Sequence, residues 1–182
     1  IKILPFFFIS LFCFSELNLE ITKGATNPFS IAISGFNENQ RMGKEVLKVI
    51  KNDLLRTGEF NIFNEKDLLS FPKKEEDINF KDFKLLNMDY LIIGSIQIED
   101  QYNIVATYDV YNVKRSIKIR NSKVFGIPKR IRQLSHYISD GIYEEITGIK
   151  GVSSTKLLYV SQTIGRKNCL LYTSDAADER SW

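Results

Sequence analysis

Apolar and polar positions repeat along the chain at spacings that predict alternating strands and helices. Residues 30–36 alternate with period two, which is typical of a strand with one buried face. A helix is predicted from an Asn39 cap to about Thr57, because apolar residues recur there every three or four positions and Gly58 follows. One stripe of this helix is apolar and should face the core: Met42, Val46, Val49, Ile50 and Leu54.

The pattern after this helix predicts four more strands. Residues 60–63 form a short apolar strand, and the continuous apolar run at 89–96 suits a central strand that is covered on both faces. After a tight turn at Asp100–Gln101, residues 102–110 and 117–125 alternate as two strands of an antiparallel meander.

Two more helices are predicted between and after these strands. A short helix around Phe83 follows a solvated loop of mixed charge at 73–77. The last helix starts at Pro128, whose missing N–H costs nothing there, and ends at Gly148. The fold class is therefore α/β (α+β), with a mixed five-stranded sheet packed by two to three helices over residues 28–150. The apolar face of the last helix comprises Ile131, Leu134, Ile138, Ile142 and Ile146.

Residues 1–15 differ from the rest of the chain and are predicted to be a signal peptide. A basic residue precedes an apolar run of about a dozen residues, which is too short to cross a bilayer as a helix but suits a secretory signal. Small side chains favour cleavage between Ser15 and Glu16. A buried amino-terminal strand is the alternative. Phe12 argues against lipidation of Cys13, because lipoprotein processing needs a small residue before the cysteine.

Composition excludes several classes of protein. The chain has 43% apolar and 26% charged residues, which fits one globular domain with additional segments. Its net charge of +3 is too small, and over the whole chain too evenly spread, to predict nucleic-acid binding. Two cysteines are too few for a disulfide framework.

Candidate catalytic and metal-binding groups are few. His136 lies off the apolar stripe of the last helix and is interpreted as a surface residue, since no cysteine or carboxylate stands at ligand spacing around it. No glycine-rich phosphate loop occurs, and no serine has a base in its sequence context. Asp140, Glu144 and Glu145 are interpreted as a solvated helix face. We therefore predict no enzymatic activity, no cofactor, no metal and no small-molecule substrate.

Three segments, taken in order, resemble the TolB family. The first is residues 49–60, VIKNDLLRTGEF, and the second is the apolar run at 89–96, DYLIIGSI. The third and most specific is residues 136–151, HYISDGIYEEITGIKG, which resembles the junction between the family's amino-terminal domain and its β-propeller. Residues 151–168 then resemble the start of a truncated propeller, with a strand at 155–163 that is expected to lack a partner. Residues 169–182 are interpreted as a translated sequencing-adapter artefact that makes no ordered contacts with the core.

The resemblance implies a non-enzymatic periplasmic scaffold of the Tol–Pal cell-envelope system, which supports outer-membrane integrity and cell division. In that family the amino-terminal region engages TolA, and the propeller binds the peptidoglycan-associated lipoprotein Pal, so Pal binding is expected only of a full-length parent. The alternative is an outer-membrane accessory factor with the same domain, of the wall-synthase activator or secretion-pore assembly type. Such factors usually carry a lipobox and lack the Thr-Gly-Ile-Lys-Gly junction.

The resemblance places the TolA-binding element in the mature amino-terminal segment, residues 16–27. Apolar and polar residues alternate there, which suits an extended strand that adds to a sheet edge of a partner. Gly24 and Asn27–Pro28 separate it from the first core strand and can serve as a hinge. The alternative is that it forms the first strand of the domain's own sheet. The candidate partner-binding residues are Glu16, Leu17, Asn18, Leu19, Glu20, Ile21, Thr22 and Lys23.

Overall fold

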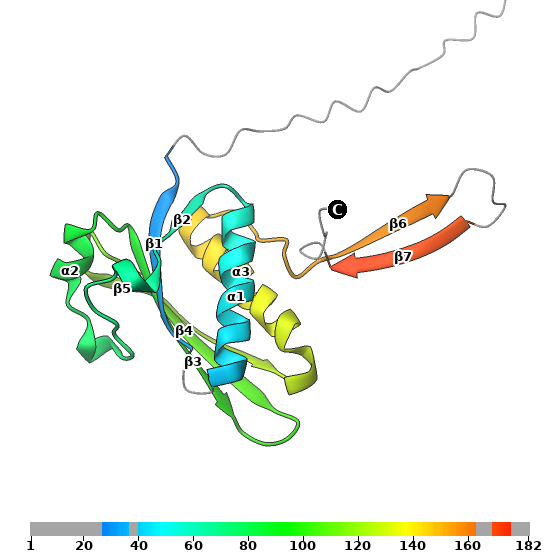
Figure 1. Cartoon of the computed structure of the whole chain (residues 1–182), viewed down its shortest axis with the longest axis horizontal. Helices are drawn as coiled ribbons and strands as arrows, with labels where there is room; N and C mark the ends of the chain where they lie inside the picture. Colours follow the sequence, from blue (N-terminus) through cyan, green and yellow to red (C-terminus); the bar gives the residue numbers. More distant parts are fainter. Residues whose placement is uncertain (1–26, 37–39, 163–168, 176–182) are drawn as a thin grey trace, which may run out of the picture.

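The computed structural model describes residues 27–36, 40–162 and 169–175 (Figure 1). The predicted signal peptide, the candidate partner-binding segment and the proposed Asn39 cap lie outside the described residues. The strands are β1 (Phe29–Gly35), β2 (Phe60–Ile62), β3 (Tyr90–Ile98), β4 (Ile104–Asn112), β5 (Ile117–Gly126), β6 (Lys156–Gln162) and β7 (Cys169–Asp175). The helices are α1 (Gln40–Arg56), α2 (Phe80–Leu85) and α3 (Ile131–Thr147), with short 3₁₀ turns η1 (Glu65–Asp67), η2 (Glu75–Asp77) and η3 (Pro128–Arg130).

Five strands form one mixed sheet in the order β2-β1-β3-β4-β5. β1 pairs in parallel with β2 and with β3, and Ile33 lies opposite Ile92 in the second pairing. β3, β4 and β5 then form an antiparallel meander. The predicted fold class is confirmed. The apolar run at 89–96 is the central strand, because neighbours on both sides cover its backbone groups.

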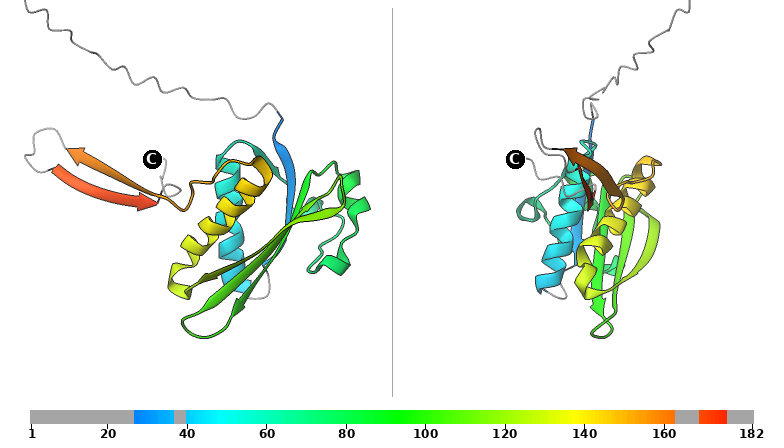
Figure 2. Two further views of the ribbon diagram at one scale, coloured as in Figure 1. Left: turned by 180° about the vertical axis from the view of Figure 1, so that it is seen from behind. Right: turned by 90° about the vertical axis from the view of Figure 1, so that its right-hand side faces the viewer.

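The sheet separates two layers of packing, which Figure 2 shows from two further sides. α1 and α3 cover one face, where Ile31 and Ile33 contact the predicted apolar stripes of both helices. α2 and its flanking loops cover part of the opposite face, where Phe83 packs with Ala32. The expectation that only one face of β1 is buried is wrong, because Ile31, Ala32 and Ile33 point to both faces and are all at most 2% exposed. Layers on both sides of the sheet exclude water from the middle of the strand, residues 31–34.

A two-stranded hairpin follows this core. β6 and β7 pair antiparallel, with Lys156 opposite Asp175 and Gln162 opposite Cys169. The expectation that the strand at 155–163 lacks a partner is therefore wrong. β7 is rich in residues that favour strands, and its backbone pairs with donors and acceptors that β6 would otherwise leave open. In Figures 1 and 2 the hairpin stands apart from the sheet and the helices.

Among residues 27–36, 40–162 and 169–175, no helix combines the length and the apolar character needed to cross a bilayer.

Candidate functional site at the helix pair and the junction

A buried polar cluster joins α1 to α3. Nδ1 of His136 donates to Oδ2 of Asp53 at 2.7 Å, and Oγ of Ser139 donates to the same carboxylate oxygen at 2.6 Å. All three residues are at most 4% exposed. A buried carboxylate is costly unless hydrogen bonds compensate it, and here one oxygen accepts both bonds that reach across from α3.

The sequence interpretation of His136 as a surface residue is wrong, since the side chain is 1% exposed. Its position off the apolar stripe is correct, but the flank on which it lies faces α1. The signal that could have found it is Asp53, which stands three residues after Ile50 and seven after Val46, on the apolar stripe of α1. A carboxylate on a buried stripe needs a polar partner on the helix that covers it.

The cluster contains a serine, a histidine and a carboxylate, but not in the order that activates a nucleophile. Activation requires the serine to donate to the second imidazole nitrogen while the carboxylate holds the first. Here Ser139 donates directly to Asp53, and Nε2 of His136 is buried without a hydrogen bond from any described residue. In this arrangement the three side chains join α1 to α3. Within the described part of the chain, no three histidine, cysteine or carboxylate side chains gather as metal ligands would.

Next to this cluster, the segment after α3 is held against the helix. α3 ends at Thr147 and is capped by Gly148, whose φ of +74° is the left-handed conformation that glycine adopts without strain. Both carboxylate oxygens of Asp140 then accept backbone bonds, at 2.8 Å each, from the N–H groups of Ser153 and Ser154. Gly151 lies so close that an added Cβ would be 2.6 Å from Cα of Asp140. We refer to Asp140, Gly151, Ser153 and Ser154 as the junction clamp.

The junction clamp borders a hollow of about 340 Å³ that includes Asp53, Ser139 and Tyr143. The interpretation of Asp140 and Glu145 as parts of a solvated face is wrong, because Asp140 is half-buried in the clamp and Glu145 accepts a hydrogen bond from Arg120 at 3.0 Å. Both partners lie far away in sequence or after the helix, so helical spacing alone could not reveal them. Glu144 is exposed, as expected.

A second polar cluster lies on the face of the sheet opposite α1 and α3. Asp109 of β4 accepts hydrogen bonds from Asn121 at 2.5 Å and Tyr111 at 3.2 Å, and pairs with Lys118 at 3.2 Å. Lys118 also contacts Glu75 at 2.5 Å, so the loop at 73–77 is tied to the sheet at one residue. Burial and the nearby Asp109 charge raise the pKa of Tyr111 to about 12, and the hydrogen bond to Glu75 raises the pKa of Lys118.

Comparison with known proteins shows what this arrangement is similar to. The family model described as the TolB amino-terminal domain matches residues 17–119. A Tol-Pal system protein TolB from Alcanivorax borkumensis is 33% identical over 147 residues, which are 81% of this chain and 34% of the relative. Another from Hahella chejuensis is 32% identical over 168 residues, which are 90% of this chain and 39% of the relative.

A solved structure agrees with these sequence matches. The crystal structure of TolB from Acinetobacter baumannii superposes with a TM-score of 0.72 at 26% identity, over 88% of this chain and 39% of that one. The chain thus spans between a third and two fifths of the length of these relatives.

Proposed function

Because the chain belongs to the TolB family, we propose that it is a non-enzymatic periplasmic scaffold of the Tol–Pal system that binds TolA through Glu16–Lys23. In a full-length parent, a β-propeller would add a second surface for the lipoprotein Pal. Together these contacts would link the inner and outer membranes and support envelope integrity and division.

The observation that supports this proposal most is the family match over residues 17–119. That match begins one residue after Glu16, the expected first residue of the mature chain, and so includes nearly all of the candidate binding segment. The alternation of Leu17, Leu19 and Ile21 with polar residues gives the segment one apolar face. An extended segment of this kind gains affinity from main-chain hydrogen bonds and specificity from alternate side chains.

The junction clamp supports a scaffold as well. Two backbone bonds to Asp140 fix the direction in which the chain leaves α3. A scaffold that holds two partners at once binds them more effectively when its two binding parts keep a defined direction. A freely moving linker between the parts would lower the effective concentration of the second site.

The test is a calorimetric titration of the chain with the carboxy-terminal domain of TolA. We expect a chain starting at Glu16 to bind and one starting at Gly24 to bind at least tenfold more weakly, with equal circular dichroism. A finer test compares Leu19→Lys with Asn18→Lys. The first should weaken binding much more, since neighbouring strand residues face opposite sides.

Equal affinity of the two chain lengths, with both folded, would remove Glu16–Lys23 as the binding element. Equal losses from Leu19→Lys and Asn18→Lys would instead show that the segment does not bind as an extended strand. The Pal surface is tested separately, by titrating a full-length parent with soluble Pal and comparing it with the present chain.

A further inference from the structure

Positive charge is concentrated in one continuous region of the chain. Residues 110–139 contain eight lysines and arginines and no aspartate or glutamate, whereas the net charge of the whole chain is only +3. The expectation of an even spread of charge is therefore wrong for this region. It comprises the end of β4, the whole of β5, η3 and the first half of α3.

β5 is the long open edge of the sheet. It is ten residues long and pairs with β4 on one side, while no described strand pairs with its other side. None of its residues is buried, in contrast to β4, where six of nine are. The backbone groups along this side are therefore available to a further strand.

Beside the end of β5 lies a hollow of about 290 Å³ between that strand and α3. Its rim has three exposed apolar or aromatic side chains: Phe125 is 68% exposed, Ile127 40% and Tyr137 48%. Gly126 also lines the hollow, and it packs so closely on α3 that an added Cβ would be 2.9 Å from Leu134. Arg130 completes the lining on the helix side.

The basic side chains around this hollow are not neutralised. Lys118 and Arg120 are paired with carboxylates farther along β5. Lys123, Lys129 and Arg130 are exposed and form no ion pair with any residue that the structure describes. Nζ of Lys123 lies 5.1 Å from the centre of the Phe125 ring, which places charge and apolar surface together.

A lysine on an edge strand can simply prevent unwanted pairing. That role does not explain why Phe125, Ile127 and Tyr137 expose apolar surface around a hollow at the same edge. An open strand beside a helix, with a hollow between them, is instead the arrangement in which extended peptides add to a sheet.

From this arrangement we propose that the β5–α3 edge binds an extended segment of a partner protein in which carboxylates alternate with apolar residues. The segment adds to β5 as a sixth strand. Its apolar side chains enter the hollow that Arg130 lines, and its carboxylates lie on the other face of the added strand, toward Lys123. No residue of the Glu16–Lys23 element belongs to this surface, and the proposal does not depend on that element.

The surface is also remote from the junction. Tyr137 and Gly148 are separated by eleven residues of α3, which corresponds to about 16 Å along the helix. In Figure 1, α3 runs from its start near the end of β5 to its far end, from which the chain leaves toward β6. A domain that follows the junction therefore starts at the other end of the helix.

The test measures fluorescence anisotropy of a labelled ten-residue peptide in which glutamate alternates with valine, added to the full chain. A peptide with lysine in place of glutamate is the first control. We expect binding of the acidic peptide that weakens with salt, and no binding of the basic one. The double variant Lys123→Glu and Arg130→Glu should raise the Kd at least tenfold.

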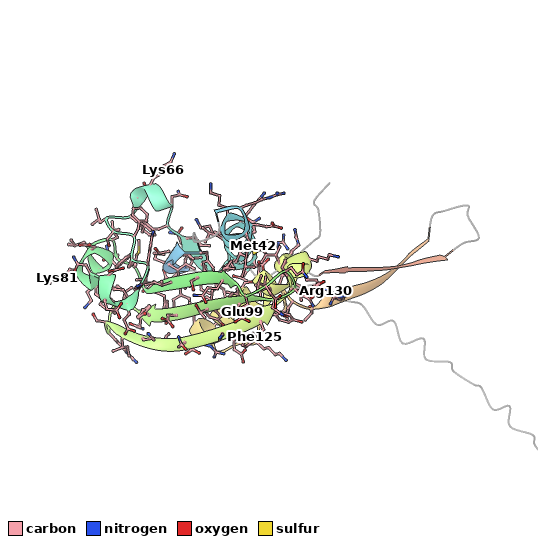
Figure 3. All side chains as sticks on the ribbon, turned by 90° about the horizontal axis from the view of Figure 1, so that it is seen from below. Met42, Lys66, Lys81, Glu99, Phe125 and Arg130 are labelled. Atoms are coloured by element: carbon pink, nitrogen blue, oxygen red, sulfur yellow. The ribbon has the colours of Figure 1, made fainter. Side chains whose placement is uncertain are left out.

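The matched control is Lys66→Glu with Lys81→Glu, which changes the net charge by the same amount. Figure 3 shows Lys66 and Lys81 on the opposite side of the molecule from Phe125 and Arg130. This pair should change the Kd by less than twofold. Phe125→Ala, at a side chain that the core does not need, should raise it about fivefold.

Two further peptides test strand addition. One is N-methylated at its odd-numbered residues, and the other at its even-numbered residues. One should lose binding and the other keep it, because only one edge of the added strand bonds to β5. Equal binding of both peptides, or equal effects of the two charge variants, would overturn the proposal. So would binding only to vesicles containing phosphatidylglycerol, or self-association of the chain that the Lys123 and Arg130 variant abolishes.

Discussion

Two carboxylates, Asp53 and Asp109, form the centres of two polar clusters on opposite faces of one sheet. Asp53 lies between two helices, is 4% exposed and has partners that come from α3 alone. The Asp109 side chain is 22% exposed and has partners from its own strand and from β5. The first cluster is almost fully buried beside the hollow at the junction clamp, whereas the second is partly open to water.

The difference shows how burial changes what a hydrogen bond contributes. Around Asp109, water can replace an exposed partner such as Asn121, so a bond of that kind adds little net stability. Around Asp53 the side chains are buried, so a lost partner leaves a desolvated polar group and every member of the cluster is hard to change. The four predictions below test this contrast, from the largest expected effect to the smallest.

Replacing Asp53 by alanine should produce the largest loss. His136 would keep two buried ring nitrogens without a protein partner, while Ser139 could still donate to the carbonyl of Ser135 at 3.0 Å. We expect the free energy of unfolding, measured in urea, to fall by about 3 kcal/mol. The matched variant Asp109→Ala should cost about 1 kcal/mol or less, since Asn121 is exposed and Lys118 keeps its ion pair with Glu75.

The double variant Asp53→Ala with His136→Leu sharpens the same test. If the cluster contributes register rather than net stability, this apolar pair, which has nearly the same total volume as the original pair, should unfold within about 1 kcal/mol of the original protein. A loss as large as that of Asp53→Ala alone would show that the polar pair itself is stabilising.

The fold was predictable where the signal is local. The apolar stripe of α1, the continuous run of β3 and the end of α3 before Gly148 all follow from spacing within one segment, although α3 itself begins at Ile131, after a 3₁₀ turn that starts at Pro128. Burial of His136 was not predictable in this way, because its partner Asp53 is 83 residues away in sequence. Only the position of that aspartate on an apolar stripe gave a hint.

Features that depend on which strands pair with one another were the least predictable from the sequence. Nothing in the spacing of residues 155–163 indicates that residues 169–175 will pair with them. The basic character of residues 110–139 could be predicted from the sequence, since this region lacks any acidic residue. The net charge of +3 for the whole chain does not reveal it. The region forms an open edge beside a helix because of the order of the strands in the sheet. The spacing of apolar residues does not determine that order.

Alkaline titration of Tyr111 tests the Asp109 cluster. Burial and the Asp109 charge raise the pKa of Tyr111 to about 12 from its ordinary value near 10. The unfolded chain therefore loses this proton first, so the associated stability is full below pH 10 and is lost as pH rises from 10 to 12. We expect a loss on the order of 2 kcal/mol across that window.

The measurement is urea unfolding between pH 9 and 12, with phenolate absorbance followed in parallel. Tyr111→Phe serves as the control, because it keeps the ring and removes the proton. Its stability should decline less steeply over the same window. Parallel curves for the two proteins would contradict the raised pKa of Tyr111.

Asp140 is an intermediate case, half-buried and bonded to backbone rather than to side chains. Asp140→Ala should release the N–H groups of Ser153 and Ser154, which we expect to exchange with deuterium at least tenfold faster. Overall stability should fall by about 1 kcal/mol. Asp140→Asn keeps one acceptor oxygen and should release one of the two groups. Unchanged exchange in Asp140→Ala would mean that the junction clamp does not fix the segment after α3.

The smallest effect is expected from the ion pair between Arg120 of β5 and Glu145 of α3. Its nitrogen–oxygen distance is 3.0 Å, and the hydrogen bond to Glu145 raises the pKa of Arg120. The side chains are 39% and 25% exposed, so water screens most of the attraction. A double-mutant cycle with Arg120→Gln and Glu145→Gln should give a coupling of about 0.5 kcal/mol at low salt, and close to zero in 1 M salt. The pair resembles the Asp109 cluster in exposure and the Asp53 cluster in joining a helix to another element. If solvent exposure determines how much an ion pair contributes, the coupling energy between Arg120 and Glu145 must stay small. A coupling above about 2 kcal/mol that does not change with salt would show that joining two elements matters more than access to water.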